Sequence, residues 1–186
     1  KEAVRGLPEM RLALERMWPV LTPAELLHDL FGSKALLKLA GSKHLSEEEY
    51  LSLYRPRRND VAEVRWTEHD VALLDEARHY LGPKPQKNLK IDEADDIRTY
   101  GHIVVDEVQD LTPMQLRMVS RRSLGGSMTV VGDIAQATGA LAPSNWDDVL
   151  EHLPTQRGSR VVGLSVGYRI PGRIMELANK VMLHAT

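Results

Sequence analysis

Hydrophobic periodicity in the first 82 residues predicts a helical region. Apolar side chains recur there at the three- and four-residue spacing of a helix face, as at Leu26, Leu27 and Leu30. Three predicted helix starts carry a hydroxyl residue that is followed three positions later by an acidic one, the pattern of a capping box. These pairs are Thr22 with Glu25, Ser46 with Glu49, and Thr67 with Asp70. The third helix should stop at Gly82.

The pattern changes after Gly101, where short apolar runs alternate with amphipathic segments. The predicted strands are residues 102–105 (HIVV), 128–131 (MTVV) and 161–164 (VVGL). The first two are rich in β-branched residues, which predicts strands that are buried on both faces. The predicted helices are residues 112–121, 144–152 and 171–181. This alternation predicts an α/β fold with a parallel sheet flanked by helices and preceded by the all-helical region.

The same patterns divide the chain into four segments. Residues 1–82 form the helical region, and residues 83–100 are a polar connector that contains Pro83, Pro85 and at most one short helix. Residues 101–159 hold the first two strands, and residues 160–186 hold the third strand and the last helix.

Composition narrows the class of protein. The chain has 186 residues, of which 42% are hydrophobic and 27% charged, which excludes a fully disordered or collagen-like chain. No apolar run reaches the ~20 residues of a membrane helix, so no membrane association is expected. Cys is absent and no secretion leader is visible, which favours a cytoplasmic protein. The missing N-terminal Met suggests that the chain was cut from a longer protein.

Charge gives little support to a dedicated nucleic-acid module. The 24 Lys and Arg residues and 26 Asp and Glu residues are spread evenly, and the net charge is −2. Such modules usually carry a basic excess that replaces counterions on phosphates. The tightest basic cluster is Arg55, Arg57 and Arg58, and we interpret it as a solvated turn rather than a phosphate track.

Polar residues directly follow each predicted strand. Ligands bind parallel sheets beyond the carboxyl ends of the strands, so these residues are the candidate site. They are Asp106, Glu107, Gln109 and Asp110 after the first strand, Gly132, Asp133 and Gln136 after the second, and Tyr168 and Arg169 after the third. Each of these groups by itself is common in turns, but the three groups in this order are rarely produced by chance.

The types of these residues suit phosphoryl transfer from a nucleotide. Asp106 can hold a hydrated Mg²⁺ on the phosphates, and Glu107 can polarise the attacking water. Gln136 can hydrogen-bond the γ-phosphate or the water, and Arg169 can neutralise the charge that develops on the phosphoryl group. Asp110 and Asp133 are interpreted as residues that orient their neighbours.

Three of these segments resemble motifs of superfamily 1 helicases of the UvrD/Rep kind. Residues 104–110 (VVDEVQD) resemble motif II, which is also called Walker B. Residues 130–136 (VVGDIAQ) resemble motif III, and residues 167–169 (GYR) resemble motif IV. The resemblance implies RecA-like domains that bind ATP and Mg²⁺. Residues 101–159 would then be the second part of the first RecA-like domain, and residues 160–186 the start of the second.

The resemblance also implies a role for each matching residue. Asp106 would serve Mg²⁺, Glu107 the hydrolytic water and Gln136 the γ-phosphate, while Arg169 would reach the same phosphate from the second RecA-like domain. The remaining residues of the matching segments would line the nucleotide site. These are Gln109, Asp110, Gly132, Asp133 and Tyr168.

Departures from the motifs point to one branch of the family. Typical members have a second acidic residue where this chain has Ala135, followed by an aromatic pair that stacks on DNA bases. Residues 137–140 (ATGA) offer no stacking side chain, and Trp146 is predicted to pack in the core. These features, together with residues 66–77, are most similar to the HelD branch, whose members are ATPases that release bacterial RNA polymerase from nucleic acid.

The phosphate-binding loop of such an ATPase is missing from the sequence. No GxxxxGK[ST] segment is present, so the chain is expected to be a fragment that does not hydrolyse ATP by itself. The resemblance implies a parent ATPase that binds RNA polymerase and releases or recycles it. An ATP-dependent DNA helicase of the UvrD/Rep type, for which DNA would be the partner, and a non-catalytic interaction domain remain alternatives.

Overall fold

The computed structural model describes residues 7–17, 19–83, 97–139, 141–154, 158–164, 166–168 and 170–182. The chain divides into two compact units, residues 1–156 and residues 157–186. The first unit contains both the helical region and the sheet. Residues 84–96 of the predicted polar connector lie outside the described residues. Within the described ranges, every helix is too short or too polar to cross a membrane.

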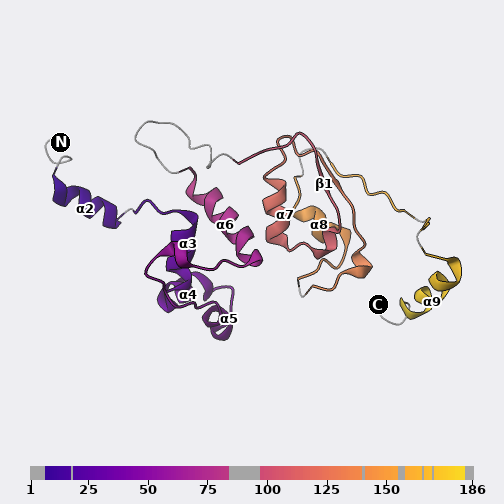
Figure 1. Ribbon diagram of the computed structural model, residues 1–186, viewed down its shortest axis with the longest axis horizontal. Helices are drawn as coiled ribbons and strands as arrows, with labels where there is room; N and C mark the ends of the chain where they lie inside the picture. Colours follow the sequence, from indigo (N-terminus) through magenta and orange to yellow (C-terminus); the bar gives the residue numbers. More distant parts are fainter. Residues whose placement is uncertain are drawn as a thin grey trace. The chain divides into compact units, whose positions relative to one another are not determined.

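Helices fill the first part of the chain, as the sequence predicts (Figure 1). Their bounds are α2 (Pro8–Met17), α3 (Pro23–Phe31), α4 (Lys34–Gly41), α5 (Glu47–Ser52), the short 3-10 helix η1 (Val61–Glu63) and α6 (Glu68–Leu81). All three predicted capping boxes are present. In the first, the Thr22 N–H donates to Glu25 Oε2 at 2.7 Å and the Glu25 N–H donates to Thr22 Oγ1 at 3.2 Å. Gly82 ends α6 with a φ of 70°, which glycine adopts readily.

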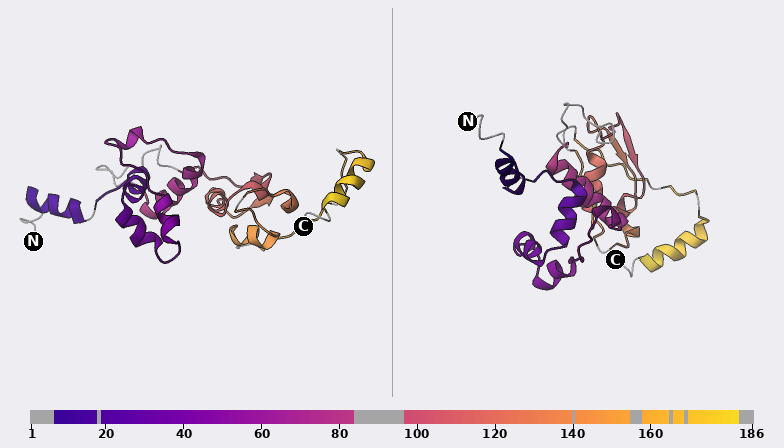
Figure 2. Two further views of the ribbon diagram at one scale, coloured as in Figure 1. Left: turned by 90° about the horizontal axis from the view of Figure 1, so that it is seen from below. Right: turned by 60° about the vertical axis from the view of Figure 1, so that its left-hand side comes forward.

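Helices α3, α4, α5 and α6 bury a common apolar core, and they lie together in both views of Figure 2. The buried members are Leu27, Phe31, Leu37, Tyr50 and Ala77. This arrangement follows from the amphipathic pattern, since each helix turns its apolar side toward the others.

An ion pair fastens the loop after α5 to the start of α6. The Arg55 guanidinium donates to both carboxylate oxygens of Asp70 at 2.8 and 2.9 Å. Hydrogen bonds from Arg55 lower the pKa of the buried Asp70 carboxyl to about 2. Arg57 pairs with Asp29 at 3.1 Å. Two members of the basic cluster are therefore engaged by carboxylates, and Arg55 is partly buried rather than solvated.

The described residues of the second part form an α/β arrangement around a two-stranded parallel sheet. Strand β1 (Ile103–Val105) pairs with β2 (Met128–Val130), and Val105 lies opposite Val130. The crossover contains η3 (Val108–Asp110) and α7 (Pro113–Ser120). The segments η4 (Ile134–Gln136) and α8 (Trp146–Glu151) follow β2. Side chains of α7 and α8 pack on the sheet around Val108, Leu116 and Val149.

The expectation that both strands are buried on both faces is wrong. Val105 is buried, whereas Val104 is 67% exposed and its partner Thr129 is also exposed. Helices α7 and α8 cover the face that carries Ile103 and Val105. β-branched residues are favoured in strands whether or not both faces are covered, so composition could not reveal the open face.

The predicted third strand is also absent from the structure. Residues 161–164 are assigned no strand, and their side chains are exposed. A strand requires a hydrogen-bonded neighbour, and the described residues of the second unit contain only the helix α9 (Gly172–Met182). The predicted last helix is confirmed.

Candidate functional site

The ends of β1 and β2 lie side by side because the two strands are parallel and in register. The Val131 N–H donates to the Val105 carbonyl at 2.8 Å, and the Val108 N–H donates to the Val131 carbonyl at 3.1 Å. These bonds continue beyond the regular strands. They bring the segment that starts at Asp106 together with the segment that starts at Gly132.

Glu107 stands at the turn that leaves β1 and has an unusual backbone conformation. Its φ of 50° and ψ of 45° are left-handed, and no other described non-glycine residue has a positive φ. This conformation costs on the order of 1–2 kcal/mol for a residue with a side chain. Its N–H donates to Asp106 Oδ1 at 2.9 Å, which helps to hold the turn. Strain of this kind is typical of functional turns.

Gln109 joins the two strand ends. Its side chain is buried, with an exposed fraction of 3% for the residue. Its Nε2 donates to Glu107 Oε2 at 2.7 Å, and its Oε1 accepts from the Asp133 N–H at 3.0 Å. One amide therefore positions the Glu107 carboxylate against the loop that follows β2.

Gly132 makes room for this bridge. A Cβ atom at this position would lie 2.4 Å from Gln109 Oε1 and 2.8 Å from Val108 Cγ1. Both distances are shorter than any van der Waals contact. Glycine is therefore required here by close packing and not by its backbone angles.

Asp133 organises the short helix η4. Its Oδ1 accepts from the Ala135 N–H at 3.1 Å, and its Oδ2 accepts from Gln136 Nε2 at 2.8 Å. The Gln136 amide is thus held beside the same loop that binds Gln109. The orienting role predicted for Asp133 agrees with these bonds.

The other predicted site residues are less tightly held. Asp106 and Asp110 are exposed, and the Asp110 side chain has no hydrogen bond or ion pair with the described residues. Tyr168 is 94% exposed within the second unit. Arg169 lies outside the described residues. The structure thus brings Glu107, Gln109 and the loop after β2 together within the first unit.

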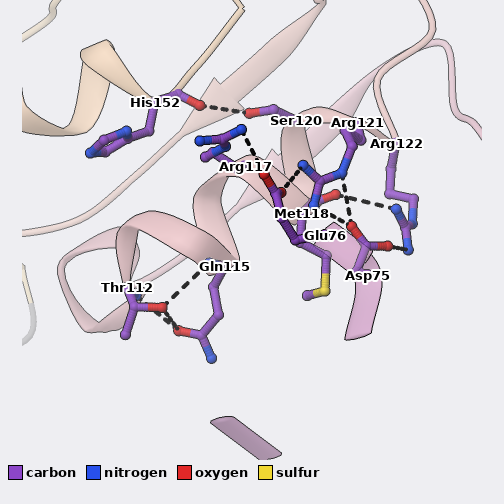
Figure 3. Close-up of polar contacts among 10 residues, drawn as sticks. All are labelled: Asp75, Glu76, Thr112, Gln115, Arg117, Met118, Ser120, Arg121, Arg122 and His152. Carbon is purple, nitrogen blue, oxygen red and sulfur yellow. Dashed lines mark hydrogen bonds and ion pairs between the residues drawn. The ribbon is translucent and has the colours of Figure 1, made fainter. Parts of the chain in front are cut away.

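A buried charge cluster connects α6 to α7, directly after the strand-end segment (Figure 3). Arg121 Nε donates to Asp75 Oδ2 at 2.8 Å, and Arg122 also pairs with Asp75. Glu76 accepts from Arg117 at 2.7 Å and from Arg121 at 2.5 Å. Burial alone would raise the pKa of Asp75, but the hydrogen bonds from Arg122 and Arg121 outweigh burial and lower it.

Sequence reasoning missed this cluster and the Gln109 bridge. Asp75 and Glu76 fall outside the apolar stripe of Leu74 and Ala77, where charged side chains are usually solvated, so no sequence signal marks them as buried. The spacing of Arg117 and Arg121 places two cations on one side of the end of α7, which is the only local sign of the cluster.

Trp146 packs against the core beneath the sheet, as predicted. Its neighbour Val149 is fully buried. The described part of the loop after Gln136 carries no aromatic side chain, since residues 137–139 are Ala, Thr and Gly.

Acidic and amide oxygens at the strand ends are chemically suited to a hydrated Mg²⁺ and a nucleotide phosphate. Within the described ranges, no three His, Asp or Glu side chains gather into a metal site of their own. A cation here would take ligands from phosphate and water in addition to Asp106. No protein-family model matches the chain, and no curated protein matches it either.

Proposed function

We propose that this chain belongs to a superfamily 1 helicase-like protein that hydrolyses ATP on a RecA-like domain. The chain supplies the part of the ATP site that activates the water and senses the terminal phosphate. The observation that carries the proposal is the buried Gln109 amide, which links the Glu107 carboxylate to the Asp133 backbone. The bond is made to the carboxylate and not to the backbone of the turn, so it fixes where the acid group lies.

In the proposed mechanism, Glu107 accepts a proton from the attacking water, and Gln109 holds the carboxylate in its place. Gln136, held by Asp133, senses the terminal phosphate through its amide. Asp106 would hold Mg²⁺, which neutralises phosphate charge when it is bound. Tyr168 and Arg169 belong to the second unit, and Arg169 would act there as an arginine finger.

The proposal requires a phosphate-cradling loop from outside these 186 residues. A Walker A loop supplies backbone N–H groups and a Lys to the β- and γ-phosphates, and the sequence contains no such segment. Most of the nucleotide affinity would come from that loop.

We further propose that the partner of the parent protein is RNA polymerase, which it would release or recycle from nucleic acid. A processive DNA helicase stacks bases on aromatic side chains. In this chain residues 137–139 have no aromatic side chain, and Trp146 packs against the core. The net charge of −2 also favours a protein partner over a DNA track. A UvrD/Rep-type helicase is the second candidate, because residues 104–110, 130–136 and 167–169 resemble its motifs apart from Ala135.

The test is ATP turnover by the full-length protein that contains this sequence. Turnover should be measured with the protein alone, with single-stranded DNA and with purified RNA polymerase. We expect Glu107→Gln to lower kcat at least about 100-fold, as loss of a general base does. Glu151→Gln, the same chemical change at an exposed position of α8 outside the strand ends, is the matched control and should retain most activity.

The outcomes separate the candidates. Co-migration with RNA polymerase and little DNA stimulation would support the polymerase-associated ATPase. Strong DNA stimulation without polymerase binding would identify a helicase. If no ATP turnover is found under any condition and Glu107→Gln leaves the cellular role intact, the chain is a non-catalytic interaction domain.

A further inference from the structure

A cavity of about 210 Å³ opens in the helical region and is not used by the proposed ATPase site. It lies between α3, the loop after α5 and the segment that follows η1. Its apolar lining is formed by Phe31, Pro56, Val64 and Trp66. Phe31 itself is buried, with the Arg55 guanidinium 4.6 Å from its ring centre, so the aromatic surface open to a binding partner is that of Trp66.

Charged groups also line this cavity, and they include two unpaired cations. The guanidinium groups of Arg58 and Arg65 have no hydrogen-bond or ion-pair partner among the described residues. Their neighbours Arg55 and Arg57 differ, because both are held by carboxylates. Arg58 and Arg65 are therefore available to bind an external anion.

Glu63 is the acidic member of the lining, and its carboxylate is likewise unpaired within the described part of the chain. His28 Nε2 accepts the Arg58 N–H at 3.0 Å, so this nitrogen is already bound within the chain. The cavity thus combines two cations, one anion and an aromatic wall.

We propose that the cavity binds an acidic and apolar peptide segment of a partner protein. Arg58 and Arg65 bind an Asp or Glu side chain of that segment, and an adjacent apolar side chain lies against Trp66 and Val64. Glu63 accepts a backbone N–H of the peptide. A nucleic-acid strand fits less well, because Glu63 repels its phosphates and because Arg55 and Arg57, which would continue the basic surface, are paired with carboxylates.

This inference does not depend on ATP hydrolysis, since no strand-end residue lines the cavity. It predicts that binding is selective for mixed acidic and apolar sequences and weakens as salt concentration rises.

The test is a peptide-display selection on the protein with a random twelve-residue library, followed by affinity measurement with fluorescein-labelled synthetic peptides from the enriched pool. The variant is Arg58→Ala with Arg65→Ala. The matched control is Lys38→Ala with Lys43→Ala, which removes the same charge from exposed positions of the helical region outside the cavity. Circular dichroism and thermal melting confirm that all three proteins fold.

We expect enrichment of peptides that combine Asp or Glu with an aromatic or aliphatic residue. Their affinity should fall at least about tenfold in the arginine variant and remain unchanged in the lysine control, because charge-assisted hydrogen bonds are lost only in the former. Enrichment of no such peptides, or equal binding to both variants, would overturn the proposal. It would also be overturned if a single-stranded DNA or RNA 20-mer displaced the peptides and itself required Arg58 and Arg65.

Discussion

At the scale of single residues, the candidate site depends on how closely two backbones approach. Gly132 lies against the amide of Gln109, and that amide in turn holds Glu107. A side chain at position 132 would displace the Gln109 side chain from its hydrogen bonds. The same close approach makes the site sensitive to a single methyl group.

Replacing Gly132 by Ala should therefore lower the stability of the protein and loosen Glu107. The added Cβ would lie 2.4 Å from Gln109 Oε1, and such overpacking costs about 1–3 kcal/mol. Urea unfolding followed by circular dichroism measures the change. Gly101→Ala is the control, because no atom lies within 4 Å of its Cβ position. Equal stability of the two variants would show that the bridge is not tightly packed.

Asp70 should raise the free energy of unfolding at neutral pH, and this contribution should be lost in acid. Its pKa is about 2 in the folded chain, below the ordinary value of 3.8, so the contribution is present above about pH 4 and is lost as pH falls toward 2. Arg55 is 41% exposed, and solvent screening limits the contribution to roughly 1–2 kcal/mol.

Unfolding of the wild type and of Asp70→Asn should be compared between pH 6 and pH 2. The stability difference should be largest near pH 6 and close to zero at pH 2. Asp29→Asn is the control, since that carboxylate is 43% exposed and its pair with Arg57 contributes little. A difference that did not change with pH would exclude a role for the charge of Asp70.

At the scale of elements, α6 and α7 are joined by charges and not only by apolar contact. Asp75 and Glu76 lie on α6, and their arginine partners lie at the end of α7 (Figure 3). Because α7 follows η3 directly, the cluster also anchors the crossover that carries Gln109.

Substitution of Asp75 by Asn should destabilise the protein by roughly 2–4 kcal/mol, because Arg121 and Arg122 would remain partly buried without their main partner. Glu68→Gln, an exposed change of the same charge on the same helix, should have an effect below about 1 kcal/mol. Thermal and urea unfolding measure both. If the two variants were equally stable, the cluster would not hold the helices together.

The open face of the sheet leads to a second prediction at this scale. Val104→Thr should change stability by less than about 0.5 kcal/mol because this side chain is largely exposed. Val105→Thr should cost about 1–3 kcal/mol, since it places a hydroxyl in the core. A large effect at Val104 would indicate that another layer covers this face in solution.

At the scale of the whole molecule, the chain has two units, and the proposed ATP site is divided between them. The strand-end residues belong to the first unit, while Tyr168 and Arg169 belong to the second. The sequence contains no phosphate-cradling loop. The proposed ATP site would therefore need a phosphate-binding loop from outside these 186 residues.

The 186-residue chain by itself should show no ATP turnover above the buffer background, because most of the phosphate contacts are missing. A phosphate-release assay with Mg²⁺ and ATP measures this. Turnover that disappears in Glu107→Gln would contradict the prediction and would show that the chain holds a phosphate site of another kind.

Local sequence determined where most helices begin and that the chain is α/β. Thr22, Ser46 and Thr67 form capping boxes with residues only three positions away, so each start depends on neighbours in the chain and is visible in the sequence. The position of the candidate residues after β1 and β2 was likewise predictable, because the ends of parallel strands meet at one edge, whereas the third strand expected before Tyr168 is absent.

Only the tertiary structure decided which of those residues touch and which strand faces are covered. Gln109 binds the Asp133 backbone across 24 positions, and Asp75 pairs with arginines 46 and 47 positions away. Val104 and Val105 are the same residue type, yet one is exposed and the other is buried. Such contacts depend on how distant segments pack, and one-dimensional periodicity carries no information about the partner that a side chain meets across the fold.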